Sequence, residues 1–467
     1  MEQIPPELLL HIFEFLDGPA PSEVSLHDQP SEDMLHAESE YSCPLKTVSL
    51  VNRIWRTLVL PSLFRHVLWR PKIASLSAFT LNPIPLLRFL EENRLDHSLT
   101  SFTLLINFFE LEDAYMVTPK IRPADLEWLW DQIFSVIDPL RFTIIARPTT
   151  LAALLSRMLF LVDAWSFDIP YHILSLARTK RDAPGNVLPN EQSKTVESSA
   201  SLSSAAIPYA ARPRKPPACP LFTIRPWTSL LLNEGSSIKV YRTYEFFLRR
   251  PPSILGALLG CEEHPNDTPL IPPSVVDFNY IAIFPLASHF EMLLQNLPKV
   301  ERLFVQLTPK SGNNILEDEG EMKQIDPGDL WMERNTSYSF LMRELTFMPD
   351  PQGNWATLRV FESGDAADKE AWEMAVQVLV SSGIRGWKAE REGVFVNHVD
   401  GEDDPDYEAQ VNGHHVALEN ATERRFLQGA LRRIAFNGVA NLPFGSMWLY
   451  MREVDPDEDQ PNLLNAL

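Results

Sequence analysis

Few side chains in this sequence have the type and spacing that catalysis needs. His414 and His415 are adjacent, so on a helix they cannot readily face one metal ion, and we expect a surface pair. The acidic residues single out no carboxylate pair with a reason to act as acid and base. The sequence has no HExxH, GxSxG, GxGxxG or Walker-type loop. It therefore predicts no enzyme, no catalytic residue, no metal site and no cofactor.

The most distinctive feature of the sequence is an apolar stretch, "IPPELLLHIFEFLD", at residues 4–17. Two prolines open a helix where the first amides have no intrahelical partner, and Glu7 suits the positive end of the helix dipole. From there to the end of the helix only His11 and Glu14 are polar. A helix that is apolar on nearly every side needs cover on more than one side. We expect one side to pack on its own domain and another to bind a partner.

A second helical segment follows an acidic spacer. Residues 19–44 contain six acidic residues and no Lys or Arg, which predicts a flexible loop. Residues 45–72 contain six basic residues and no acidic one. One helix face is predicted from the i, i+3, i+7, i+10 spacing of Val48, Val51, Trp55 and Leu58. Pro61 is expected to end or restart this helix, and a short helical turn should follow it. The N-terminal unit is therefore two or three helices.

Beyond residue 72, helical stretches alternate with short strand-like runs. Helix-then-strand pairs are predicted in "ADLEWLWDQIFSVID" with "LRFTIIA", in "LASHFEMLLQNLP" with "VERLFVQLTP", and in "KEAWEMAVQVLVSSG" with "IRGWKAE". Such alternation favours α/β units on a parallel sheet, repeated loosely along the chain. Of the tryptophans in the first of these helices, Trp128 and Trp130 should face different sides, so one of them can be exposed.

The first 70 residues resemble the F-box, especially as it occurs in fungal proteins. The matching residues are Pro5, Glu7, Leu8, Ile12 and Leu16, followed by Leu45, Ser49, Leu50, Val51, Asn52, Arg53 and Trp55. "PSLFRHV" resembles the end of the family's module. The departure is the spacer, since F-boxes usually join these helices by a few residues and about 25 intervene here. A longer loop costs only about 0.6 kcal/mol per doubling of its length, so the helices can still pair.

The resemblance implies a partner and a role. F-box proteins bind the Skp-type adaptor of SCF ubiquitin ligases and hold a protein substrate with the region downstream. The chain would then be a substrate adaptor in ubiquitin-dependent protein degradation, raising the substrate's effective concentration beside a ubiquitin-charged enzyme. The basic cluster suits an acidic adaptor. The adaptor-binding residues expected from the resemblance are Ile4, Pro5, Leu8, Ile12, Leu16, Leu45, Leu50, Val51 and Trp55. Each of them could instead be core of the helical module.

The fold class expected is therefore α/β, with an F-box module followed by an irregular leucine-rich-repeat-like α/β solenoid. The domains expected are the module at 1–70 with its acidic insertion at 19–44, a first repeat region at 73–177, a disordered Ser/Pro-rich insertion at 178–220, a second repeat region at 221–452 and an acidic tail at 453–467.

The composition limits the classes of binding partner and the cellular compartment that we expect for this protein. The net charge of −21 over 467 residues argues against a general nucleic-acid binder, although "KVYRTYEFFLRR" at 239–250 interleaves aromatic and basic residues. The three cysteines are far apart, which fits a reducing compartment. No secretory signal or membrane span is predicted, so we expect a cytoplasmic or nuclear protein.

Two other classes of function stay open. The first is a non-ligase interaction protein, which would bind the Skp-type adaptor without delivering a substrate for ubiquitination. The second is an enzyme whose catalytic residues are scattered through the large C-terminal part. The identity of the substrate is not encoded in any motif.

Overall fold

A computed structural model describes residues 5–18, 20–30, 44–71, 81–106, 121–159, 171–179, 219–264, 266–346, 353–382 and 386–398. The chain divides into one unit ending at His398 and a second, residues 399–467, which lies outside the described residues. The expected acidic tail, the pair at His414 and His415, Ile4 and nearly all of the expected insertion at 178–220 also lie outside them.

Three short helices form a module near the N-terminus: α1 (Pro6–Glu14), α3 (Pro44–Ser49) and α4 (Arg53–Leu63). Leu9 and Phe13 of α1 pack with Leu45 and Val59 in a small core of their own. The single helix expected over residues 48–58 is wrong, because the chain breaks between α3 and α4. The side chain of Asn52 accepts a hydrogen bond from the Trp55 amide at 2.8 Å and so caps α4 at its start.

The end of the module also differs from expectation. Pro61 lies inside α4, which continues to Leu63 before it stops. The short helical turn expected next is instead strand β1 (His66–Trp69), which pairs in parallel with β2 (Ser101–Leu105). This pairing partner lies about 35 residues further along the chain, so local spacing could not reveal it.

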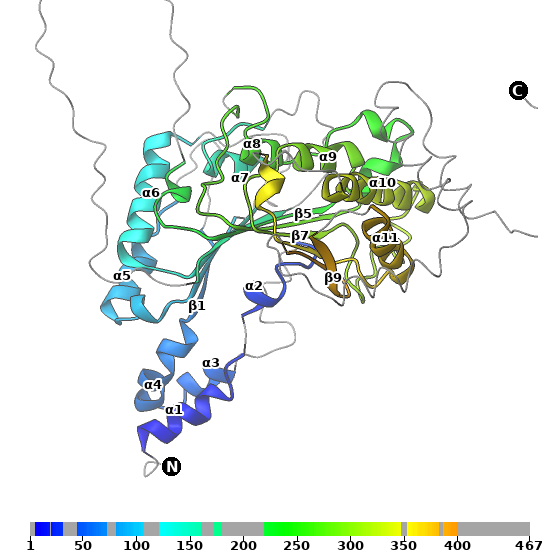
Figure 1. Cartoon of the computed structure of the whole chain (residues 1–467). Coiled ribbons are helices and arrows are strands. Elements are labelled where there is room, and N and C mark those ends of the chain that lie inside the picture. The colour runs from blue at the N-terminus through cyan, green and yellow to red at the C-terminus, as the bar shows by residue number, and fades with distance from the viewer. Residues whose placement is uncertain are drawn as a thin grey trace, which may run out of the picture. The chain divides into compact units, whose positions relative to one another are not determined.

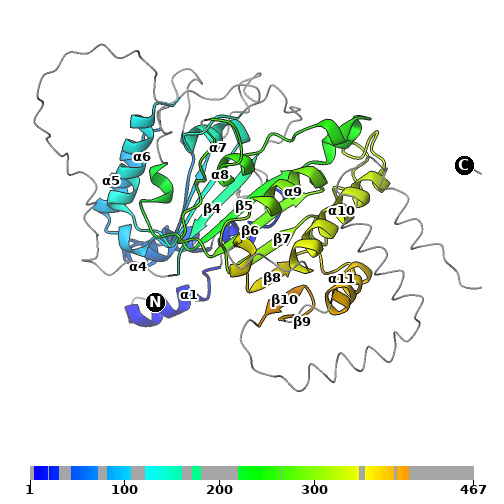
Figure 2. The same ribbon diagram turned by 45° about the horizontal axis from the view of Figure 1, so that its top comes forward.

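Ten strands form one sheet in the order β1-β2-β3-β4-β5-β6-β7-β8-β10-β9. The remaining strands are β3 (Arg141–Ala146), β4 (His172–Ala177), β5 (Ser229–Ser236), β6 (Asp277–Ile283), β7 (Arg302–Gln306), β8 (Val360–Ser363), β9 (Trp387–Arg391) and β10 (Val394–Asn397). Most neighbours are parallel, but β4 is antiparallel to both of its neighbours and β10 is antiparallel to both of its own. The mixed α/β class with a mostly parallel sheet is confirmed (Figure 2).

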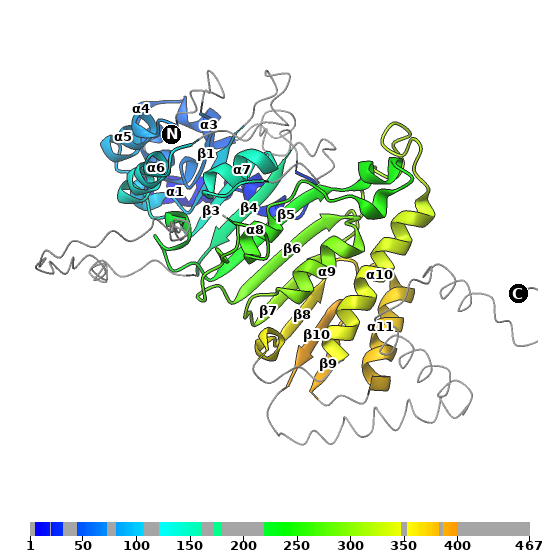
Figure 3. The ribbon, with the colours of Figure 1, turned by 90° about the horizontal axis from the view of Figure 1, so that it is seen from above.

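Helices cover one face of this sheet, as Figures 1 and 3 show. They are α5 (Ile84–Glu92), α6 (Pro123–Val136), α7 (Pro148–Leu154), α8 (Leu255–Leu259), α9 (Ala287–Gln295), α10 (Pro327–Thr346) and α11 (Lys369–Ser382). The three predicted helix-strand pairs are confirmed as α6 with β3, α9 with β7 and α11 with β9. Trp130 of α6 is fully buried while Trp128 is 44% exposed, as their spacing predicted.

Short 3-10 helices complete the connections: η2 (Asp96–Ser98), η3 (Pro220–Phe222), η4 (Ile238–Arg242), η5 (Phe246–Leu248) and η6 (Asn354–Thr357). Alternation along the strands separates two apolar cores. Phe102 and Leu104 of β2 face the helices, whereas Leu105 belongs to a second core on the other face. That second face also receives a segment that the sequence predicted to be a flexible loop, residues 20–30, which contains α2 (Pro21–Val24).

Candidate functional site

The helical module leaves large apolar side chains exposed although its own core is filled. In α1, Leu8 is 56% exposed, Ile12 48% and Phe15, at its end, 80%. Around the turn between α3 and α4, Leu50 is 77% exposed and Ile54 65%. The ring of Phe13 packs edge-on against Trp55, with 5.4 Å between ring centroids, so the amino end of α4 lies against α1. The module therefore presents an apolar surface on two of its helices.

Among the described residues, those expected to bind an adaptor divide into two groups. Pro5, Leu8, Ile12, Leu16, Leu50 and Val51 are exposed. Leu45 is only 2% exposed and Trp55 is half-buried, and both pack in the module's core. Their side chains hold α3 and α4 in place, which is the alternative role that the sequence left open.

Two strongly exposed residues, Phe15 and Ile54, were missed. Phe15 follows Leu8 by seven residues, which is two turns of a helix, so the α1 spacing alone could have placed it on the same side. Ile54 is the second residue of α4, directly after the break at Asn52, and its side chain is 65% exposed.

The basic residues of the module divide in a similar way. Lys46, Arg53 and Arg56 are exposed, whereas Arg65 forms an ion pair with Asp17 at 2.9 Å. Lys72 lies outside the described residues. Exposed positive charge therefore accompanies the apolar surface on α3 and α4.

A buried polar cluster lies under the helices, centred on Glu234 at the end of β5. Its carboxylate accepts hydrogen bonds from Tyr280 at 2.7 Å and from Ser253, and it pairs with His289 at 2.8 Å. Burial raises the pKa of Glu234, but the charge and hydrogen bond of His289 outweigh it and lower the pKa to about 2. The carboxylate is thus a fixed buried charge, and its side chain is only 5% exposed.

His172 completes this cluster without a polar partner. It is fully buried on β4, and neither ring nitrogen has a hydrogen-bond partner in the part of the chain that the structure describes. Burial lowers its pKa to about 4, although the nearby Glu234 acts in the opposite direction. The imidazole is therefore neutral at physiological pH.

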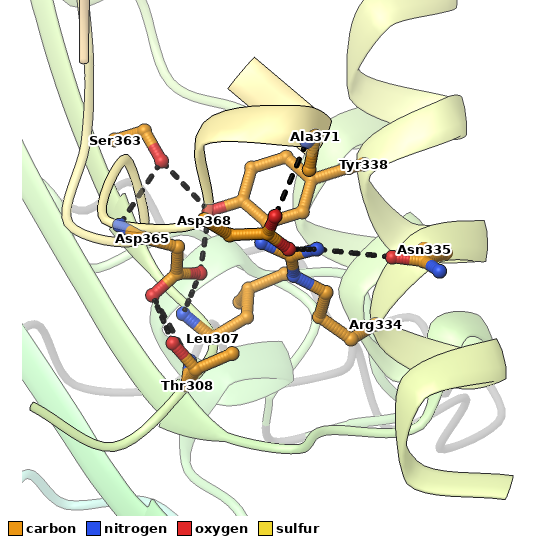
Figure 4. Close-up of polar contacts among 9 residues, drawn as sticks. All are labelled: Leu307, Thr308, Arg334, Asn335, Tyr338, Ser363, Asp365, Asp368 and Ala371. Carbon is orange, nitrogen blue, oxygen red and sulfur yellow. Dashed lines mark hydrogen bonds and ion pairs between the residues drawn. The ribbon is translucent and has the colours of Figure 1, made fainter. Parts of the chain in front are cut away.

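A second network joins the ends of two strands to α10, as Figure 4 shows. Asp365 follows β8 and accepts hydrogen bonds from the amides of Leu307 and Thr308, at 2.8 and 3.1 Å, and from the hydroxyl of Tyr338 at 2.6 Å. Burial raises the pKa of Asp365, and these hydrogen bonds oppose that shift. The network fixes the chain where it leaves β7.

Arg334 supports the network from the same helix. Its guanidinium pairs with Asp368 at 2.9 Å and lies over the ring of Tyr338, 5.0 Å from the centroid. Asp368 in turn accepts a hydrogen bond from the Ala371 amide at 3.2 Å, at the start of α11 (Figure 4). The residues around Asp365 are therefore held from β7, β8, α10 and α11 together.

Comparisons with known proteins give no family. A scan against protein-family models, a search of curated proteins and a search of solved structures each find no match. Among the described residues, no group of three or more His, Cys, Asp or Glu side chains is placed to hold a metal ion. Within the same residues, no helix combines the length and the apolar character needed to cross a bilayer.

Removing the Asp365 carboxylate should destabilise the sheet. We expect Asp365→Ala to lower the free energy of unfolding by about 2–4 kcal/mol, because it leaves two backbone amides and two hydroxyls without their acceptor. Tyr338→Phe removes the two hydrogen bonds that the Tyr338 hydroxyl makes with Asp365 and Ser363, and it should cost about 1–2 kcal/mol. Urea unfolding of the two variants measures the difference. Equal stabilities would show that the network does not hold the strand ends.

The buried imidazole of His172 should make stability depend on pH. Its folded-state pKa of about 4 lies below the ordinary histidine value of 6.5, so the unfolded chain binds a proton that the folded chain excludes. Stability is then full above pH 6.5 and falls as the pH drops toward 4, by on the order of 3 kcal/mol. We expect His172→Leu to flatten the curve of unfolding free energy against pH in this range. Parallel curves for the variant and the wild-type chain would contradict this assignment.

Proposed function

We propose that the chain is an F-box-type substrate-recruiting subunit of an SCF-type ubiquitin ligase. Its N-terminal helices would bind the Skp-type adaptor, and the sheet region would hold a protein substrate. The chain itself would catalyse no reaction. Its contribution would be proximity, because a substrate held beside a charged enzyme reacts as if it were highly concentrated.

The observation that carries this proposal is the apolar surface of the module. A helical unit with a filled core gains nothing from keeping Phe15 80% exposed and Leu50 77% exposed in water. Burying a side chain of this size against a partner contributes about 1.5–3 kcal/mol. A few such residues are enough to carry a protein interface, and exposed apolar patches of this kind mark interaction sites.

The surface also agrees with the resemblance residue by residue. Leu8, Ile12, Leu50 and Val51 match the F-box pattern and are exposed, while Leu45 and Trp55 match it and hold the helices together. The exposed Arg53 and Arg56 beside them would attract an acidic adaptor. One module thus supplies both an apolar contact surface and charge complementarity.

The sheet supports the second half of the proposal. From β1 to β8 the strands lie in chain order, with connecting helices on one face. This is the arrangement expected of an irregular leucine-rich-repeat-like array. The reversed β4 and the β9–β10 hairpin depart from a regular repeat. We expect the substrate to bind on the other face of the strands, part of which residues 20–30 cover.

Charges on the module surface should abolish adaptor binding without unfolding the chain. We expect the double variant Ile12→Asp with Leu50→Asp to weaken binding of a purified Skp-type adaptor by more than tenfold, because two carboxylates would be buried at the interface. Leu248→Asp is the matched control, since Leu248 is 66% exposed and belongs to η5, which is not one of the module's helices. Biolayer interferometry with the full chain measures the affinities.

The double variant should keep the thermal stability of the wild-type chain, because both side chains are exposed. An unchanged adaptor affinity would refute the proposal. Co-purification of a cullin scaffold with the adaptor separates a ligase subunit from a protein that binds the adaptor alone.

A further inference from the structure

Residues 20–30, the described part of the acidic insertion between the module's helices, lie on the sheet. Figure 1 shows α2 on the side of the sheet away from α7–α10. Leu26, just after α2, is only 3% exposed and belongs to the second apolar core, together with Ile145, Ile173 and Leu231 of the strands. The segment 20–30 thus covers part of the face that the helices leave open.

The three residues Leu26, His27 and Asp28 make different contacts with the sheet. The Leu26 side chain enters the apolar core, and the His27 ring stacks on Phe304 with 4.8 Å between centroids. The Asp28 carboxylate forms an ion pair with Lys310 at 2.8 Å. Each side chain therefore meets a surface of matching chemistry: apolar, flat aromatic and positively charged.

The backbone of the same residues is held by side-chain amides. Asn233 donates from Nδ2 to the carbonyl oxygens of Leu26 and Asp28, at 2.9 and 2.7 Å, and Gln306 donates to that of His27 at 3.5 Å. Asn233 is fully buried and Gln306 is 2% exposed. Burying a side-chain amide destabilises the folded state unless its N–H groups donate hydrogen bonds. Both hydrogen bonds that Asn233 Nδ2 donates in the described part of the chain go to carbonyl oxygens of this segment.

These contacts form a recognition site for a peptide in a turn, since the Asp28 amide donates to the carbonyl oxygen of Ser25 at 3.0 Å. Clamping of main-chain carbonyls provides affinity, while side-chain pockets provide specificity. The surface also continues past Asp28. Gln29 borders two hollows of about 630 and 300 Å³, the larger lined also by Tyr171, Lys239 and Glu321. Space is therefore available for residues that follow the clamped triplet.

We infer that Asn233, Phe304, Gln306 and Lys310, with the apolar pocket beneath Leu26, are a binding site for protein segments of the pattern large aliphatic, flat aromatic or His, acidic. Residues 26–28 occupy this site in cis as an internal mimic of such a segment. That the segments belong to ligase substrates rests on the proposed function, but the binding itself does not.

Occupation in cis sets a threshold for any competitor. A tethered segment acts at an effective concentration of the order of millimolar, so a free peptide with the same contacts binds the intact chain far more weakly than a chain whose segment has been removed. Only a segment with better contacts, or one presented at high local concentration, displaces it. Residues 26–28 therefore restrict binding at this site to segments that can displace them.

The test uses the full chain with residues 24–30 replaced by Gly and Ser at equal length, and a fluorescent peptide of sequence SEVSLHDQPS, residues 22–31. We expect the peptide to bind the replaced chain at least tenfold more tightly than the wild-type chain in fluorescence anisotropy. A peptide with Leu26→Asp should lose at least tenfold in affinity for the replaced chain. Absence of peptide binding by a folded replaced chain, or equal binding by both chains, would overturn the inference.

A charge exchange tests the contact with Lys310 directly. In the replaced chain, Lys310→Glu should weaken the original peptide by at least tenfold and accept a peptide carrying Asp28→Lys. If neither change alters affinity, the proposed site is wrong. Should the replaced chain fail to fold, Leu26→Ser in the full chain loosens the segment at constant length and provides the same comparison.

The assay contains no adaptor, so its outcome is independent of the proposed function. The module variant Ile12→Asp with Leu50→Asp should leave peptide binding to the replaced chain unchanged. The replaced chain should in turn bind the adaptor like the wild-type chain. Failure of one measurement and not the other shows which of the two proposals is wrong.

Discussion

Ten paired strands with alternating side chains must be covered on both faces, and the rest of this structure follows from that constraint. Seven helices bury one set, such as Phe142 and Ile144 of β3, in the larger core. The other set, such as Ile145 of the same strand, needs a different cover. Part of that cover is residues 20–30, which come from between two helices of the N-terminal module. The module and the sheet are thereby joined by more than the covalent link at β1.

The N-terminal module has more large apolar side chains than its own core buries. Its core accommodates Leu9, Phe13, Leu45 and Val59, and no room is left for the remaining apolar residues of its helices. Leu8 and Ile12 come one position before the buried Leu9 and Phe13, and this step turns their side chains by about 100° away from the core on α1. An apolar stripe that its own domain does not cover is best explained by a partner, which is why the proposed function is built on it.

Polar side chains where strands end serve a different purpose. Asp365 holds the amides of Leu307 and Thr308, next to the residues that contact the insertion. Asn233, at the end of β5, uses its amide on the carbonyls of that insertion. Glu234, the next residue, points under the helices and contacts His289 there at 2.8 Å. Neighbouring residues of one strand therefore serve opposite faces, one for binding and one for contacts under the helices.

The sequence alone determined what depends on neighbouring residues. The 3.6-residue period located α6, α9 and α11, the short apolar runs after them located β3, β7 and β9, and the spacing of Trp128 and Trp130 showed that one could be exposed. The apolar face of α1 could be recognised in the same way. These features follow from local geometry, in which each residue's direction is fixed by its position along the helix or strand.

Tertiary structure decided whatever depends on distant partners. Residues 66–69 became a strand because Ser101 and its neighbours offer a parallel ladder, and Asn52 divided one expected helix into two. The acidic insertion has the composition of a loop, yet Leu26 lies in a core built from strands more than 70 residues away. Composition cannot show this, because one buried leucine and two clamped carbonyls are enough to fix a short segment when a prepared surface meets it.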